Sequence, residues 1–233
     1  ETITDSFTFT LSDGTTTLAS ASFAITVTPV DDAPVLNVNN GLTLNEGATS
    51  SITTALLNAT DVDTANASLI YTITGAVANG RVELSTNAGV AITSFSQSDL
   101  IAGLVRYVHN GSETITDSFT FTLSDGTTTL ASASFAITVT PVDDAPVLSV
   151  NNGLTLNEGA TSSITTALLS TTDVDTANAA LIYDITGATV NGRVELSTNA
   201  GVAITSFSQA DLAGGLVRYV HNGSETITDS FTF

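Results

Sequence analysis

Residues 118–140 read SFTFTLSDGTTTLASASFAITVT, and this stretch decides the fold class. Phe119, Phe121 and Leu123 alternate with Ser and Thr in its first half, and residues 135–140 repeat the alternation. Strict alternation places apolar side chains on one face of a β-strand and polar ones on the other, and β-branched Thr favours the extended backbone on the wet face. The Ser-Asp-Gly sequence at 124–126 supplies a turn. The stretch therefore predicts two antiparallel strands with one buried face.

The same patterns recur along the chain. Further strands are expected at residues 35–38, 42–44, 69–74, 81–84, 90–95 and 104–109, with a hairpin closed at 87–89. Residues 52–56 have short helical spacing but are Thr-rich, so we interpret them as a strand. Ser96 with Asp99 three residues later predicts a capping box and one short helical turn. Eight or nine short strands in a repeat of 112 residues predict an all-β, antiparallel β-sandwich.

An internal repeat sets the domain organisation. The segment ETITDSFTF occurs at Glu1, Glu113 and Glu225, which gives a period of 112 residues, and 102 of those 112 positions are identical between the copies. A unit of this length is a domain and not a solenoid repeat. Prolines bracket acidic pairs at 29–34 and 141–146, where we place the boundaries. Residues 1–32 are then the last strands of one repeat, 33–144 a complete sandwich, and 145–233 a repeat that lacks its last strand.

Composition excludes several classes of function. The chain has 23 acidic residues, 4 Arg and no Lys, a net charge of -19, and no Cys. Such charge opposes binding to nucleic acid and to anionic membranes and favours cations as partners. Disulfides and thiolate metal sites are excluded. No apolar run approaches the length of a membrane span, no export signal is visible, and the missing initiator Met suggests a fragment of a longer protein.

Paired carboxylates are the main chemical signal. Asp61-Val62-Asp63 and its copy Asp173-Val174-Asp175 place two like charges on one side of an extended segment, which invites a cation. Oxygen ligands without His or Cys favour Ca²⁺. Further carboxylates stand in the linkers, at Asp31-Asp32 and Asp143-Asp144, and at Glu46. The alternative is that these Asp residues are solvated turn residues.

Other polar residues indicate structural roles. His109 and His221 are interpreted as residues of a strand end or loop, because abundant hydroxyls alone do not make a nucleophilic site. Arg81 beside Glu83, and Arg106, are interpreted as cross-strand ion pairs or stacking partners. Carboxylates that recur in each repeat, with no Trp platform, do not favour glycoside hydrolysis, so we expect no enzyme.

The order of these motifs resembles that of two families of repeats. Glu46, the linker 143–146, the Asp-Val-Asp copy and the later Asn178 and Tyr183 follow an order that resembles cadherin-like repeats. Residues 95–126, from Phe-Ser-Gln to Asp-Gly, resemble the repeats of the chondroitin sulfate proteoglycan group, which are common in giant bacterial surface adhesins of the RTX type. The resemblance implies a cadherin-like sandwich with Ca²⁺ at the junctions. The implied ligands are Asp5, Asp31, Asp32, Glu46, Asp61, Asp63, Asp117, Asp143, Asp144, Glu158, Asp173 and Asp175.

These observations predict an extracellular, calcium-stiffened spacer module in a long adhesin or surface fibre, with neighbouring repeats as partners. One alternative is a subunit of a self-assembling filament whose chains complete each other by strand addition. Another is a module that itself binds carbohydrate or a partner protein. The incomplete repeats fit either an arbitrary cut from a long array, which near-identical repeats favour, or strand exchange between chains.

Overall fold

The computed structural model describes residues 3–233, so the first two residues of the expected segment 1–32 lie outside the described part. The chain divides into two compact units, Glu1–Pro141 (unit 1) and Val142–Phe233 (unit 2). Each unit has its own hydrophobic core.

The strands of unit 1 are β1 (Ile3–Phe9), β2 (Ala21–Val27), β3 (Val35–Asn39), β4 (Leu42–Asn45), β5 (Thr49–Ser51), β6 (Leu57–Thr60), β7 (Ile70–Gly75), β8 (Gly80–Leu84), β9 (Ser94–Ser96), β10 (Val105–His109), β11 (Thr116–Ser124) and β12 (Ala133–Thr140). Its helical turns are η1 (Asn66–Ser68), η2 (Ser85–Asn87) and α1 (Gln97–Ile101). The all-β prediction is confirmed.

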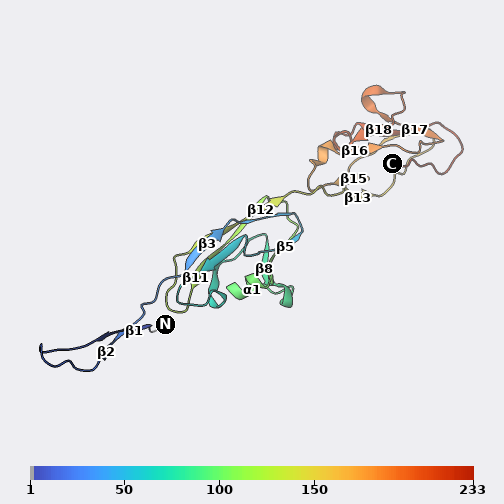
Figure 1. Ribbon diagram of the computed structural model, residues 1–233. Coiled ribbons are helices and arrows are strands. Elements are labelled where there is room, and N and C mark those ends of the chain that lie inside the picture. The colour runs from blue at the N-terminus through green and yellow to red at the C-terminus, as the bar shows by residue number, and fades with distance from the viewer. Residues whose placement is uncertain (1–2) are drawn as a thin grey trace. The chain divides into compact units, whose positions relative to one another are not determined.

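Unit 1 begins with a two-stranded hairpin (Figure 1). Strands β1 and β2 pair antiparallel with Phe7 opposite Phe23. Every described residue of both strands is exposed, so neither face of this hairpin is covered.

The rest of unit 1 is a sandwich. One layer is a five-stranded sheet in the order β4-β12-β11-β7-β9, and the other side consists of β5-β10-β8 and the pair β3-β6. The pairs are antiparallel except β4 with β12, which run parallel. This parallel pair departs from the expected antiparallel sandwich, because β4 lies at the edge beside a strand from the other end of the repeat.

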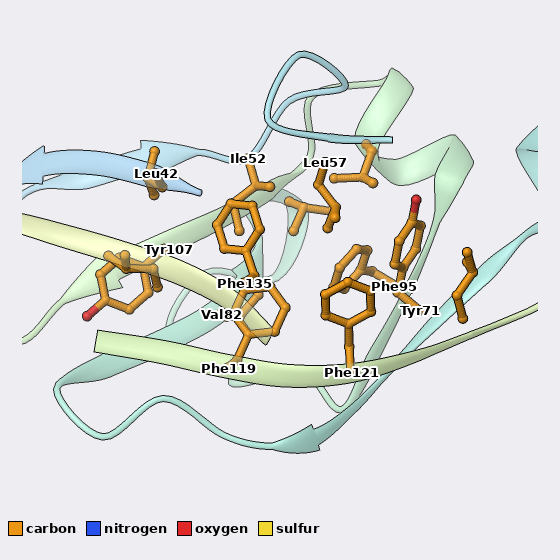
Figure 2. Packing of buried hydrophobic residues seen from close by; sticks show 14 of the residues in the cluster. Leu42, Ile52, Leu57, Tyr71, Val82, Phe95, Tyr107, Phe119, Phe121 and Phe135 are labelled. Atoms are coloured by element: carbon orange, nitrogen blue, oxygen red, sulfur yellow. The ribbon is translucent and has the colours of Figure 1, made fainter. Parts of the chain in front are cut away.

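The core lies between the layers and follows the predicted alternation. Phe119, Phe121, Phe135 and Tyr71 of the five-stranded sheet are buried in one cluster with Tyr107 and Val82 of the opposite layer (Figure 2). The intervening Thr and Ser residues of β11 and β12 face outward and are exposed or partly exposed. Aromatic rings of this size dominate the burial energy of a small core.

The helical turn α1 forms as predicted. The amide of Asp99 donates to the Ser96 hydroxyl at 3.2 Å, and the amide of Ser96 donates to the Asp99 carboxylate at 2.8 Å. This capping box satisfies the first amides of the turn. The buried side chain of Gln97 then accepts the hydroxyl of Tyr71 at 2.6 Å.

Each of the four arginines forms an ion pair with a buried glutamate. The Glu83 side chain is fully buried and contacts Arg81 on its own strand and Arg106 on the neighbouring strand. The hydrogen bond from Arg81, with those from Gly89 and Arg106, outweighs burial and lowers the pKa of Glu83 to about 2. Unit 2 repeats the arrangement at Glu195 with Arg193 and Arg218. The expected cross-strand ion pair is confirmed for Arg106 with Glu83, whereas Arg81 pairs with Glu83 along its own strand.

Two predicted strands are wrong in part. Residues 53–56 form a turn between β5 and β6, held by the amides of Leu56 and Leu57 on the Thr53 carbonyl. Residues 90–93 are not a strand, and β9 begins only at Ser94. The amide of Gly89 donates to the buried Glu83 carboxylate at 2.7 Å. The segment makes isolated backbone hydrogen bonds, from Ile92 to Val82 of β8 and from Ile73 of β7 to Thr93, and not a continuous strand ladder.

The strands of unit 2 are β13 (Val147–Asn151), β14 (Thr161–Ser163), β15 (Leu169–Thr172), β16 (Ile182–Asp184), β17 (Gly192–Leu196), β18 (Ser206–Ser208) and β19 (Val217–His221). Its helical turns are η3 (Asn178–Ala180), η4 (Ser197–Asn199) and α2 (Gln209–Ala213). Residues 154–157, the counterparts of β4, are not a strand, and residues 225–233 make only an isolated bridge from Thr232 to Gly187. Across residues 3–233, no helix is long and apolar enough to span a membrane.

Candidate metal centre

The turn after β6 organises one aspartate around backbone amides. The amides of Asp63 and Thr64 donate to Asp61 Oδ1 at 2.8 and 2.7 Å, and the amide of Asp61 itself donates to Asn66 Oδ1 at 2.8 Å. The other carboxylate oxygen, Asp61 Oδ2, is buried and has no hydrogen-bond partner within the described residues. One carboxylate oxygen of Asp61 therefore stabilises the turn, and the other has no hydrogen-bond partner among the described residues.

The turn between β11 and β12 has the same property. The amides of Thr127 and Thr128 both donate to Asp125 Oδ1 at 2.7 Å. Asp125 Oδ2 is buried, and no group in the described part of the chain donates to it. A covered anionic oxygen without a donor costs free energy unless a cation lies beside it.

The linker before β3 forms a hydrogen bond with each of these two turns, so the linker and both turns lie together at one end of unit 1. The amide of Asp32 donates to Asp63 Oδ2 at 2.7 Å. The hydroxyl of Thr128 donates to Asp31 Oδ2 at 2.9 Å. We call Asp31, Asp32, Asp61, Asp63 and Asp125 the acidic end.

The acidic end brings several carboxylates to one region of unit 1, but their oxygens do not form a tight cluster. Oxygen ligands alone favour Ca²⁺ over zinc or copper. Among residues 3–233, no three carboxylates of the acidic end lie within 4.8 Å of one another. The residues present fit Ca²⁺ by the chemistry of their oxygen ligands and by the two buried oxygens that have no hydrogen-bond partner among the described residues.

Unit 2 repeats the first turn. The amides of Asp175 and Thr176 donate to Asp173 Oδ1 at 2.9 and 2.7 Å, and the amide of Asp173 donates to Asn178 Oδ1 at 3.1 Å. The amide of Asp144 donates to Asp175 Oδ2. Asp143 is exposed. The linker-to-turn contact is thus a property of the repeat.

At the other end of β12, two glutamates approach each other. Carboxylate oxygens of Glu46 and Glu113 lie within 4.8 Å, and the amide of Glu46 donates to the carbonyl of Thr140 at 2.9 Å. His109 holds the two segments: its Nδ1 accepts the amide of Gly47 at 3.1 Å, and its Nε2 lies 3.2 Å from the Thr114 hydroxyl. His109 is the last residue of β10, which confirms the expected strand-end position.

Three of the predicted ligands lie elsewhere. Asp117 accepts the amides of Ala78, Asn79 and Ser118 and the hydroxyl of Tyr107. Burial raises its pKa, but these hydrogen bonds outweigh it and the net pKa is lowered. This geometry supports a structural role for Asp117. Asp5 lies in the exposed strand β1, and Glu158 is exposed in unit 2.

Sequence reasoning missed Asp125 and Glu113 as candidate ligands. Asp125 was assigned to a turn only, and nothing in Ser-Asp-Gly reveals that one of its oxygens is buried. Glu113 begins one of the three ETITDSFTF copies. It follows His109 by four residues, as Glu225 follows His221, and this repeated spacing was the available signal.

Comparison with known proteins places these features in a family. A family profile described as Cadherin-like matches residues 34–139 and 146–233. The solved structure of human CDH23 EC21-23 superposes with a TM-score of 0.48 at 18% sequence identity, and covers 100% of this chain and 72% of that chain.

Curated relatives include extracellular matrix proteins that are much longer than this chain. Extracellular matrix protein 3 of Lytechinus variegatus is 34% identical over 242 residues, which covers 100% of this chain and 8% of that protein. Human Extracellular matrix organizing protein FRAS1 is 36% identical over 219 residues, with 93% and 5% covered. Human Chondroitin sulfate proteoglycan 4 is 41% identical over 145 residues, with 61% and 6% covered. The chain spans less than a tenth of the length of each of these relatives.

The comparisons confirm the resemblance to cadherin-like and chondroitin sulfate proteoglycan repeats. Two of the relatives are named as proteins of the extracellular matrix. The module is extracellular. The profile match over both units shows that the chain belongs to the cadherin-like family.

Proposed function

We propose that the chain is a non-enzymatic spacer module of a long extracellular adhesin or surface fibre, stiffened by Ca²⁺ at the junctions between repeats. The extracellular structural role of its relatives supports the class of function. A giant bacterial adhesin of the RTX type as the parent protein is part of this proposal.

One observation carries the calcium proposal. Asp61 Oδ2 and Asp125 Oδ2 are buried carboxylate oxygens without a hydrogen-bond donor among the described residues, and both turns contact the linker that carries Asp31 and Asp32. Turn residues that merely face solvent would not bury such an oxygen. Asp61, Asp63 and Asp125 would hold the ion with the linker aspartates, as would Asp144, Asp173 and Asp175 in the next repeat.

The ion would act on the linker. Without it, the clustered carboxylates repel each other. The chain has a net charge of -19 and no lysine that could offset this repulsion. With it, carboxylates of the linker and of the domain share one cation, which restricts the linker. Extracellular modules bind Ca²⁺ with Kd values of about 10⁻⁴ to 10⁻³ M, so the linker would stiffen outside the cell and stay loose at cytosolic concentrations.

The repeat period extends the proposal to the other end of each domain. Glu46 and Glu113 precede the linker 141–146 along the repeat, so we include them with Asp143 in the junction that leads to the next repeat. Hard oxygen ligands from both sides of a linker would couple consecutive domains.

The test is thermal unfolding and small-angle scattering of the whole chain in millimolar Ca²⁺ and in chelator. A ligand selective for the folded state stabilises it by RT ln(1 + [Ca²⁺]/Kd), which is about 0.4 to 1.4 kcal/mol at 1 mM Ca²⁺ for Kd values of about 10⁻³ to 10⁻⁴ M. We therefore expect a higher melting temperature and a longer, narrower particle with Ca²⁺.

Matched variants locate the site. Asp61→Asn and Asp125→Asn should reduce the calcium-dependent rise in melting temperature. Asp184→Thr is the control, because it removes one charge and places in unit 2 the residue that unit 1 has at position 72. Equal melting curves with and without Ca²⁺, or an equal loss in the control, would reject the acidic end as a calcium site.

A second candidate function is the subunit of a self-assembling filament. A multimer in chelator, detected by sedimentation, would separate it from the calcium-stiffened spacer.

A further inference from the structure

Six Asn-Gly pairs occur in the sequence, three in each copy of the repeat, with their asparagines at positions 40, 79, 110, 152, 191 and 222. In such a pair, the amide nitrogen of the glycine can attack the side-chain carbonyl carbon of the asparagine, because glycine has no Cβ that obstructs the approach. The contacts around the pair at 110–111 and its copy at 222–223 differ from those around the other four.

At the pair 110–111, a base lies against the attacking nitrogen. His109 Nδ1 accepts the amide of Gly111 at 3.3 Å and the amide of Gly47 at 3.1 Å. Because both partners are donors, Nδ1 carries the lone pair, and the ring proton is on Nε2, which lies 3.2 Å from the Thr114 hydroxyl. The residue is only 3% exposed, so its neighbours fix the ring. His109 therefore presents an unprotonated nitrogen to the proton that Gly111 has to lose.

The carbonyl group under attack is hydrogen-bonded as well. The amide of Ser112 donates to Asn110 Oδ1 at 3.0 Å. This bond closes a small ring that contains both Asn110 Cγ and the Gly111 nitrogen, so one turn holds the two reacting atoms. A donor on this oxygen stabilises the negative charge that the oxygen acquires when the nitrogen attacks. Asn110 and Gly111 are exposed, so water can reach the site and ammonia can leave it.

The other pairs of unit 1 are held in a different way. Asn40 Nδ2 donates to the carbonyl of Ala55 at 3.1 Å, and Asn79 Nδ2 lies 3.5 Å from the carbonyl of Thr116. A carbonyl can only accept, so it fixes the side-chain nitrogen but cannot give it the proton that it needs to leave. Gly80 is also the first residue of β8, and the ladder with β10 holds its backbone. The counterparts in unit 2 make the same two side-chain contacts, at Asn152 and Asn191.

We propose that the pair 110–111 and its copy are self-modification sites, at which the chain converts its own asparagine to aspartate or isoaspartate with water as the co-reactant. The Gly111 nitrogen gives its proton to His109 Nδ1 and forms a bond to Asn110 Cγ. The bond from Cγ to Nδ2 then breaks, and Nδ2 takes the proton from His109 and leaves as ammonia, which closes a cyclic succinimide. Water adds to either carbonyl of this ring and opens it. The net reaction is the hydrolysis of one side-chain amide; nothing is oxidised or reduced, and His109 is regenerated as a general base.

The same atoms meet in unit 2. His221 Nδ1 accepts the amide of Gly223 at 3.2 Å and the amide of Gly159 at 3.0 Å. The amide of Ser224 donates to Asn222 Oδ1 at 2.9 Å. The base and the oxyanion donor therefore recur with the repeat, and the reaction is expected at both copies.

Each conversion places a new carboxylate at the end of β10. One nitrogen of His109 binds both Gly47 and Gly111, so the new charge arises beside the turn that carries Glu46. The chain has a net charge of -19 before the reaction, and the added charge increases the repulsion at this turn. Isoaspartate also lengthens the main chain by one carbon atom next to the residue that His109 binds.

Peptide mapping by mass spectrometry measures the conversion at each pair. Trypsin separates the two copies of the site into different peptides, residues 107–193 and 219–233, and fragmentation locates the modified residue. In the folded chain at neutral pH, Asn110 and Asn222 should convert at least tenfold faster than the other four asparagines. In urea, where the contacts are lost, the six rates should become similar. Rates at Asn110 and Asn222 that do not exceed the other four in the folded chain would overturn the proposal.

His109→Gln tests the base, because glutamine cannot take up the proton. Conversion of Asn110 should fall at least tenfold, while Asn222 in the same molecule keeps its rate and serves as the matched control. Asn79 reports the folding of unit 1, since its conversion accelerates if the variant unfolds; the reciprocal variant His221→Gln then supplies the test, with Asn222 slowed and Asn110 unchanged. An unchanged rate at the site whose histidine was replaced would overturn the role of the histidine.

Discussion

At the residue scale, the carboxylates of this chain divide into those that the fold satisfies and those that it leaves ready for a ligand. Asp117 accepts four hydrogen bonds and Glu83 contacts two arginines, so the protein itself supplies their partners. Asp61 and Asp125 each use one oxygen for turn amides and bury the other. The second kind of carboxylate is the one that a cation would complete.

The Glu83 ion pair should govern part of the acid stability. Its pKa of about 2 in the folded protein lies below the ordinary value of 4.5, so its stabilisation is complete above about pH 4.5 and is lost as the pH falls towards 2. Glu83→Gln should lower the melting temperature at pH 7, because two arginines lose their counterion, and should flatten the decline between pH 4.5 and 2.

Thermal unfolding from pH 2 to 7 measures this effect. Glu195→Gln is the matched variant and should affect the transition of unit 2 alone. Parallel pH profiles of the Glu83→Gln variant and the unmodified chain would contradict the role of this carboxylate.

At the scale of elements, β12 organises its neighbours. It pairs antiparallel with β11 and parallel with β4, and its apolar face contributes Phe135, Ile137 and Val139 to the core. The same sequence in β2 is exposed on both faces. Identical strand sequences thus contribute differently to the stability of the fold, depending on whether other elements cover them.

We therefore expect Ile137→Ala to destabilise unit 1 by about 2–5 kcal/mol, because it removes a fully buried side chain and leaves a cavity. Ile25→Ala makes the same change in the same local sequence, and we expect an effect within about 0.5 kcal/mol, since Ile25 is exposed. Denaturant unfolding at low protein concentration compares the two. Similar losses for both variants would contradict the assignment of β2 as an uncovered strand.

At the scale of the whole molecule, the chain is two units with separate cores. Among residues 3–233, the core of unit 1 has eighteen buried hydrophobic residues and that of unit 2 has eight. Burial supplies most of the stabilisation of a small domain. Unit 2 should therefore be the less stable of the two.

Calorimetry should resolve two transitions for the 233-residue chain, with unit 2 melting first. Leu57→Ala should lower the upper transition and Leu169→Ala the lower one, because these equivalent leucines are buried in different cores. Each loss should be about 2–5 kcal/mol. A single transition that both variants lower equally would show that the units unfold together.

The sequence alone determined the repeat, the all-β class, the inward faces of β11 and β12, the capping box before α1 and the candidate aspartates in the linker and at positions 61 and 63. These follow from periodicity and short-range spacing, which act between residues near each other in the chain. The tertiary structure decided the turn at 53–56, the irregular segment 90–93, the parallel pair β4–β12, the buried oxygen of Asp125 and the approach of Glu46 to Glu113. The parallel pair β4–β12 and the approach of Glu46 to Glu113 depend on contacts between residues far apart in sequence, such as Gly47 with His109, which a local sequence pattern does not predict. The segment after Gly89 is held by Glu83, whose position depends on Arg106 of another strand.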